Sequence, residues 1–216
     1  MRKIVFILMF AIAGCEAAVE ATEKMDISIR DTILKVPTKY MLPNLPRSMV
    51  PSSKGMDASV SSISIRVPLG DIGIYIAEKK GPAATILSHI YSSSDVSKEN
   101  DQIARAWEAR GEYKDRIVEY DSEQKLWRIY RKATYPRVWF FFDKDPEKHV
   151  AESAVAYVAS CLLSPSAPLE LSYARCHKEL HYKKLFNDIV FSGRDFDSLD
   201  KIVAAYQALL EQWLVE

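Results

Sequence analysis

The stretch RIVEYDSEQKLWRIYRKATYPRVWFFF, residues 116–142, decides the fold class. Apolar and polar residues alternate over 116–120 and again over 125–131, and the polar run 121–124 separates the two segments, which predicts a β-hairpin. Residues 137–142 are almost entirely apolar, so we expect a strand near the centre of a sheet. Successive strands with short connections indicate an antiparallel sheet.

The flanking sequence adds further strands. Residues 26–36 alternate isoleucine with polar residues, which favours a strand or a tight hairpin, and residues 59–69 alternate in the same way. We expect another strand at 72–77. A second hairpin is expected to begin at or just after Cys176 and to turn near residues 186–188.

Helical periodicity marks four segments. Residues 83–91 and 98–110 predict short helices, and residues 151–162 predict a longer one because Ala151, Val155, Val158 and Leu162 recur at helical spacing. The strongest pattern is the last, where a cap at Asp197 or Ser198 precedes Leu199, Ile202, Val203, Tyr206, Leu209, Leu210 and Trp213. Strands do not alternate with long helices, so we expect an α+β fold: a mainly antiparallel sheet with several packed helices, including this C-terminal amphipathic helix.

The first fifteen residues, MRKIVFILMFAIAGC, are typical of an export signal. Arg2 and Lys3 precede an apolar run that suits a signal peptide and is too short to span a bilayer, which needs about 20 apolar residues. The stretch Ile-Ala-Gly-Cys at 12–15 resembles the lipobox of bacterial lipoproteins, with Ile12 where Leu is usual. The resemblance implies that residues 1–14 are removed and that Cys15 receives lipid. The alternative is an ordinary secreted protein cut after Ala17 or Ala18.

This resemblance also implies a location and a domain organisation. Residues 15–25 are small and acidic, which predicts a lipidated tether, and residues 26–216 are expected to form a single α+β globular domain. Glu16 follows the lipidated cysteine, where an Asp commonly retains lipoproteins in the inner membrane. We therefore expect the periplasmic side of the outer membrane more than the inner membrane.

Charge and cysteine content narrow the classes of partner. Residues 1–14 hold two of the 29 basic residues and none of the 29 acidic ones, so the mature chain would carry 27 and 29, a formal net charge of −2. This balance gives no electrostatic case for nucleic acid. Cys161 and Cys176 form an even pair in a compartment that permits disulfides, which predicts a bond between them. Two buried free thiols are the alternative.

No residue pattern predicts a catalytic, metal or cofactor site. His177, Glu179 and His181 would share one face of a strand, but a metal site needs three or four ligands and no further one is evident. Asp143 and Asp145 flank a strand end, where acidic residues usually form turns. We therefore expect a protein that is not an enzyme. An envelope hydrolase remains the alternative, and it would place Asp143, Asp145 or His181 in a deep cleft.

Two segments are candidates for binding a protein partner. Residues 127–139 mix aromatic side chains with arginines, a composition found at interaction hot spots, and a two-faced strand pair is the alternative. The proline-rich segment 37–57 could present apolar side chains to a partner or use them to cover the sheet. The predicted partner-binding residues are Tyr40, Met41, Leu45, Trp127, Tyr130, Arg131, Tyr135 and Arg137.

In outline the chain resembles small periplasmic immunity proteins, which neutralise toxins delivered between competing bacteria, such as type VI secretion effectors. The resemblance is carried by the lipobox, the segment KVPTKY at 35–40, the Cys161 and Cys176 pair, a hairpin and a closing helix. It implies a non-enzymatic role, a membrane contact through lipid on Cys15, and a secreted effector as partner. The alternative is a structural or accessory lipoprotein of an envelope or secretion assembly.

Overall fold

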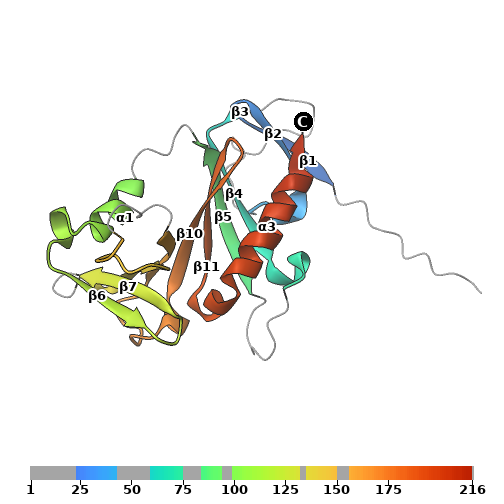
Figure 1. Ribbon diagram of the computed structural model, residues 1–216. Helices are drawn as coiled ribbons and strands as arrows, with labels where there is room; N and C mark the ends of the chain where they lie inside the picture. Colours follow the sequence, from blue (N-terminus) through green and yellow to red (C-terminus); the bar gives the residue numbers. More distant parts are fainter. Residues whose placement is uncertain are drawn as a thin grey trace, which may run out of the picture.

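The computed structural model describes residues 23–42, 59–74, 84–93, 99–131, 135–149 and 156–215. Within these ranges the chain forms an eight-stranded sheet, a four-stranded sheet and two α-helices. Figure 1 shows the two helices on opposite sides of the larger sheet. A mainly antiparallel α+β fold is confirmed, with fewer helices in the described ranges than the sequence predicted. No helix in these ranges is both long enough and apolar enough to cross a membrane.

The eight-stranded sheet is antiparallel throughout. Strands β6 to β11 lie side by side in chain order, and β5 and β4 extend the sheet beyond β11. The hairpin expected within 116–131 is confirmed, with Arg116 opposite Arg131 and Asp121 opposite Leu126. In spatial order the strands are β4 (Ser62–Pro68), β5 (Thr85–Ser92), β11 (Leu185–Ser192), β10 (Arg175–Tyr182), β9 (Tyr157–Leu162), β8 (Tyr135–Phe142), β7 (Leu126–Arg131) and β6 (Arg116–Asp121).

The four-stranded sheet joins the two ends of the described chain. The tight hairpin expected over 26–36 is confirmed as β1 (Lys24–Ile29) and β2 (Thr32–Pro37), which turn at Arg30 with a φ of 50°. β3 (Ser59–Val60) pairs parallel to β1, and β12 (Leu214–Val215) pairs antiparallel to β2. The residues straight after the last helix are therefore bonded to the first hairpin.

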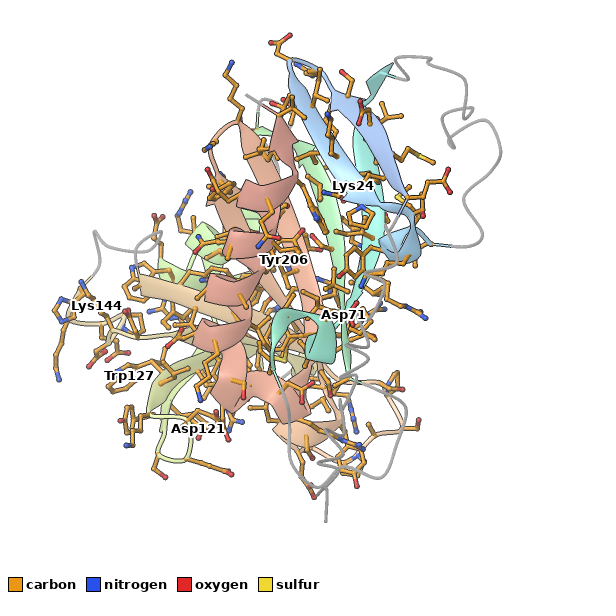
Figure 2. The ribbon with its side chains drawn as sticks, turned by 90° about the vertical axis from the view of Figure 1, so that its right-hand side faces the viewer. Lys24, Asp71, Asp121, Trp127, Lys144 and Tyr206 are labelled. Atoms are coloured by element: carbon orange, nitrogen blue, oxygen red, sulfur yellow. A yellow bond between two sulfur atoms is a disulfide. The ribbon has the colours of Figure 1, made fainter. Side chains whose placement is uncertain are left out.

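Helix α3 (Leu199–Trp213) covers one face of the larger sheet, which we call the inner face (Figure 2). Its buried residues recur every three or four positions, as the sequence predicted: Leu199, Ile202, Tyr206, Leu210 and Trp213. The Tyr206 hydroxyl is fully buried, donates to Ser88 Oγ at 2.7 Å and lies 3.3 Å from Asn187 Oδ1. Ser198 occupies the N-cap position but makes no side-chain capping bond.

Helix α1 (Glu99–Trp107) lies within the predicted 98–110 segment and covers part of the opposite, outer face. Its Trp107 ring centre lies 4.8 Å from that of Phe142 in β8. The adjoining Tyr113 packs edge-on against Phe140 at 5.8 Å. A second apolar cluster therefore forms over β7 and β8, separate from the main core under α3.

Four sequence-based expectations are wrong. Residues 157–162 form strand β9 and not the second half of a helix, so Cys161 lies in a strand. Residues 85–92 form β5, whose alternating β-branched residues suit a sheet better than a helix. Residues 186–188 lie inside β11, because the hairpin already turns at Lys183. Of the strand expected at 72–77, residues 72–74 close a 3-10 turn at Gly73, with a φ of 74°, so no strand begins at residue 72; residues 75–77 lie outside the described ranges.

Candidate functional site

The aromatic residues and arginines of β7 and β8 are divided between the two faces of the sheet. Successive strand residues point to opposite faces, so Trp127 and Arg131 lie on the outer face, toward the α1 cluster, and Tyr130 lies on the inner face. Figure 2 shows Trp127 beside Asp121 at the end of the molecule farthest from Lys24. The predicted residues therefore form two separate groups.

On the inner face, Arg128 organises a group that includes the predicted residue Tyr130. Its guanidinium pairs with Glu119 and lies 4.7 Å from the centre of the Trp139 ring. The Tyr130 hydroxyl donates to Glu119 Oε2 at 3.1 Å. Burial lowers the pKa of Arg128, and the Glu119 carboxylate paired with it compensates its charge within the chain. These contacts join β6, β7 and β8, so the group stabilises this end of the sheet.

On the outer face, the predicted residues contact other side chains of the chain. The Trp127 ring centre lies 5.4 Å from that of Tyr120, which is half-exposed at the sheet end. The Arg131 guanidinium lies 5.6 Å from the centre of the Tyr113 ring. Tyr135 pairs with Arg131 through the backbone, and its side chain lies outside the described part of the chain.

Only residues 37–42 of the proline-rich segment 37–57 lie in the described ranges, and the predicted residues among them pack against the core. Tyr40 is 4% exposed, and its ring centre lies 5.4 Å from that of Trp213 at the end of α3. Met41 forms a backbone bridge to Ile65 and packs against the core. These two side chains therefore cover the core, which is the alternative that the sequence left open. Leu45 lies outside the described residues.

Arg137 braces the connection between β9 and β10, residues 163–174. Its Nη1 donates to the carbonyl oxygens of Ser164 at 2.7 Å and Ala167 at 2.6 Å. The Leu163 amide donates to the Arg137 carbonyl at 2.9 Å, which fixes the start of the connection to β8. A residue predicted to bind a partner thus acts on a neighbouring loop through its side chain and its backbone.

The predicted disulfide closes the base of this connection. Cys161 and Cys176 are directly opposed in the β9–β10 ladder, are almost completely buried and are joined by a bond. At the last residue of the connection, the Ala174 carbonyl accepts a hydrogen bond from the Gly193 amide at 2.9 Å. A side chain at Gly193 would collide with the Leu171 carbonyl oxygen, so the approach of the two segments depends on glycine there.

The braced connection carries exposed apolar side chains. Among the described residues, six large apolar side chains are exposed, and three of them are Leu162 (48%), Leu169 (60%) and Tyr173 (51%). They lie on or beside one short segment. The helix predicted over 151–162 hid Leu162 from sequence analysis, because it placed this residue on the buried face.

The histidines form a polar row across the outer face. His177 Nδ1 lies 3.1 Å from Asp188 Oδ2, and His89 Nδ1 lies 2.6 Å from Ser64 Oγ. His177, Glu179 and His181 do alternate along β10 as predicted for a strand, but the His181 ring packs on Phe186 with 4.9 Å between centres. In the described part of the chain, no group of three or more His, Cys, Asp or Glu side chains is placed to hold a metal ion.

The two acidic residues that flank β8 lie in different surroundings. Asp145 accepts a bond from the Glu147 amide at 3.0 Å and pairs with Lys148 at 3.2 Å, as expected of a turn residue. Asp143 lines a hollow of about 480 Å³ with Asp197 and Asp200 at the start of α3. Burial lowers the pKa of the nearby Lys178, while Glu179, Asp200 and Asp143 oppose the shift.

A second hollow lies on the outer face beside the braced connection. It measures about 290 Å³, and its walls include Arg66 from β4, Tyr173 from the connection and Arg175 from β10. Four separate stretches of sequence line this hollow, so no local motif predicts it. The one indication in the sequence is the alternation of apolar and polar residues along β4, which directs Arg66 to the opposite face of the sheet from Ile65 and Val67.

Comparison with known proteins gives one structural likeness. No family model and no curated protein matches the sequence. Among solved structures, the chain is similar to an immunity protein of the Stenotrophomonas maltophilia type IV secretion system, with a TM-score of 0.48 and 10% sequence identity over 90% of this chain and 94% of that one.

Proposed function

We propose that this chain is a lipid-anchored envelope protein that binds and neutralises an envelope-targeting toxin without catalysing a reaction itself. The braced β9–β10 connection carries the proposal. Its base is closed by a disulfide, and Arg137 holds its first turn through two carbonyl oxygens. A loop already held in one conformation loses little entropy on binding, which favours tight inhibition.

The exposed side chains of this connection suit a protein partner. Leu162 and Leu169 offer apolar area, and Tyr173 offers an aromatic ring, the residue type enriched at energetic hot spots. Arg175 lies directly opposite Leu162 in the β9–β10 ladder and supplies a charged rim. An apolar centre with a charged edge is the usual anatomy of a protein interface.

A genetic test separates this function from that of an assembly component. Cells that lack this chain should poison themselves or their siblings when the gene for the cognate toxin is intact, and should grow normally when both genes are deleted. A structural or accessory lipoprotein would leave a secretion or envelope defect in both strains. Normal growth of the single deletion beside cells that deliver the toxin would refute the proposal.

A matched pair of variants tests the role of the connection. Leu169→Thr should reduce protection against the toxin, because it removes apolar area from the most exposed large apolar side chain of the connection. Ile33→Thr removes similar area from the exposed side of β2, where Ile33 is 41% exposed, and should leave protection unchanged. Equal protection by both variants, at equal protein levels, would place the binding surface elsewhere.

The lipid anchor has its own test. The full chain should partition with membranes and carry a mature N-terminus at Cys15, which mass spectrometry of the purified protein would detect. Cys15→Ser should release the protein into the soluble envelope fraction. A soluble mature form beginning after Ala17 or Ala18 would show that the chain is secreted without lipid.

A further inference from the structure

Arg66 and Arg175 differ from the other arginines of the chain. In the part that the structure describes, neither side chain takes part in a hydrogen bond or an ion pair. Each of the remaining described arginines has at least one such interaction or a ring contact: Arg30, Arg105, Arg110, Arg116, Arg128, Arg131, Arg137 and Arg194. Within the described residues, two positive charges on one face are thus left without an ion-pair partner.

Strand geometry directs both side chains to the outer face. Arg66 lies between Ile65 and Val67, which are fully buried on the inner face, so its side chain points the other way. Arg175 precedes the buried Cys176 and is paired with Ser192 of β11 on one side. Both arginines reach the same hollow from opposite walls.

The floor of the hollow combines apolar and hydroxyl groups. Leu87 and Val190 are paired in neighbouring strands and form its apolar part. Thr85 and Ser192 add hydroxyl groups that can donate to an anion. With about 290 Å³, the hollow has room for one or two side chains and lies at the small end of the range for small-molecule sites.

We infer that Arg66 and Arg175 bind the carboxylate of an Asp or Glu side chain presented by the protein partner. Guanidinium groups match a carboxylate with parallel, charge-assisted hydrogen bonds. Tyr173 lines the hollow and Leu162 lies opposite Arg175 in the β9–β10 ladder, so the charged hollow is continuous with these two exposed side chains of the connection. That continuity favours a protein ligand over a free anion. The inference rests on the proposed function and names the chemistry of its partner.

The test uses a fluorescein-labelled hexaglutamate peptide and the full chain in detergent. Fluorescence anisotropy should show binding of hexaglutamate and none of hexaglutamine. Arg66→Met with Arg175→Met keeps the apolar stems and should weaken binding about tenfold or more, because both charge-assisted contacts are lost. The control is Lys201→Met, which removes one exposed charge from α3 on the other side of the sheet and should leave binding unchanged.

Several results would overturn the inference. These are no binding of hexaglutamate by the wild-type chain, equal weakening by Lys201→Met, or displacement of the peptide by inorganic phosphate at the same concentration as by free hexaglutamate. The last result would make the hollow a site for small anions. The peptide assay does not require the toxin. A wild-type chain that binds hexaglutamate but does not protect cells against the toxin would therefore refute the proposed function and leave the carboxylate site in place.

Discussion

Reduction of the Cys161–Cys176 bond should lower the free energy of unfolding by about 3 kcal/mol. The two cysteines are 15 residues apart, and closing a loop of that size removes about that much entropy-derived free energy from the unfolded chain. For a protein of this size, each kcal/mol shifts the melting temperature by about 2–4 °C. The reduced protein should therefore melt roughly 6–12 °C lower.

The assay compares urea unfolding of the wild-type chain with and without reductant. Reduction leaves both sulfur atoms in the core, where Cys161 is 1% exposed and Cys176 is fully buried, so it isolates the effect of the cross-link. The double variant Cys161→Ala with Cys176→Ala also removes those atoms. It should lose roughly a further 1–2 kcal/mol through poorer packing.

Coincident unfolding midpoints for the oxidised and reduced chains would refute this reasoning. That result would mean that the reduced, unfolded chain already keeps these strands together, so that the bond removes little further entropy from it. A double variant that is as stable as the reduced wild-type chain would contradict only the packing part of the estimate.

Three further changes have defined outcomes. Tyr206→Phe removes the buried hydroxyl shared with Ser88 and Asn187 and should cost about 1–3 kcal/mol in urea unfolding, because polar groups are left buried; an unchanged midpoint would mean that water replaces the hydroxyl. Gly193→Ala should cost roughly 3 kcal/mol or more in thermal unfolding, since its Cβ would collide with the Leu171 carbonyl, and a neutral result would show that the connection can move aside. Asp71→Asn should cost less than about 1 kcal/mol at pH 7, because its ion pair with Lys39 at 2.8 Å is screened by solvent. The hydrogen bond from Lys39 lowers the pKa of Asp71, so this stabilisation is present above the ordinary aspartate pKa and is lost as pH falls through the lowered one. The two proteins should therefore become equally stable in acid, and a difference that grows as pH falls would contradict this assignment.

Elements with a strong local pattern were predictable from sequence. The hairpin of β6 and β7 is specified by alternation on both sides of a polar turn, and α3 by five buried residues at helical spacing. The disulfide followed from the count of cysteines and the expected compartment. In each case the information lies within a few neighbouring residues or in a simple pairing rule.

Strand β9 was not predictable in the same way. Val158 and Leu162 satisfy a helical spacing, but the buried residues of the strand are Ala159 and Cys161, which alternate. What decides the conformation is the presence of β8 and β10 on either side, whose backbone groups pair with it. Long-range pairing overrides local periodicity here, and the error also hid the exposed Leu162.

The candidate surface depends on the same long-range arrangement. Arg66, Tyr173 and Arg175 lie far apart or on different elements, and only the sheet order brings β4 and β10 to either side of one hollow. Conversely, the mixed segment at 127–139 is one stretch of sequence whose side chains the pleat separates. Faces of a sheet, and not stretches of chain, define what a partner can contact.

The pairing of β12 with β2 sets the order in which the first hairpin can be covered during folding. Leu34 and Ile33 lie opposite Leu214 and Val215, so this edge of the first hairpin stays unpaired until residues 214 and 215 can reach it. A nascent or truncated chain exposes that edge to other strands. Closure of this edge is thus a late event in folding, and a chain that stops before residue 214 would keep an open strand edge that favours aggregation.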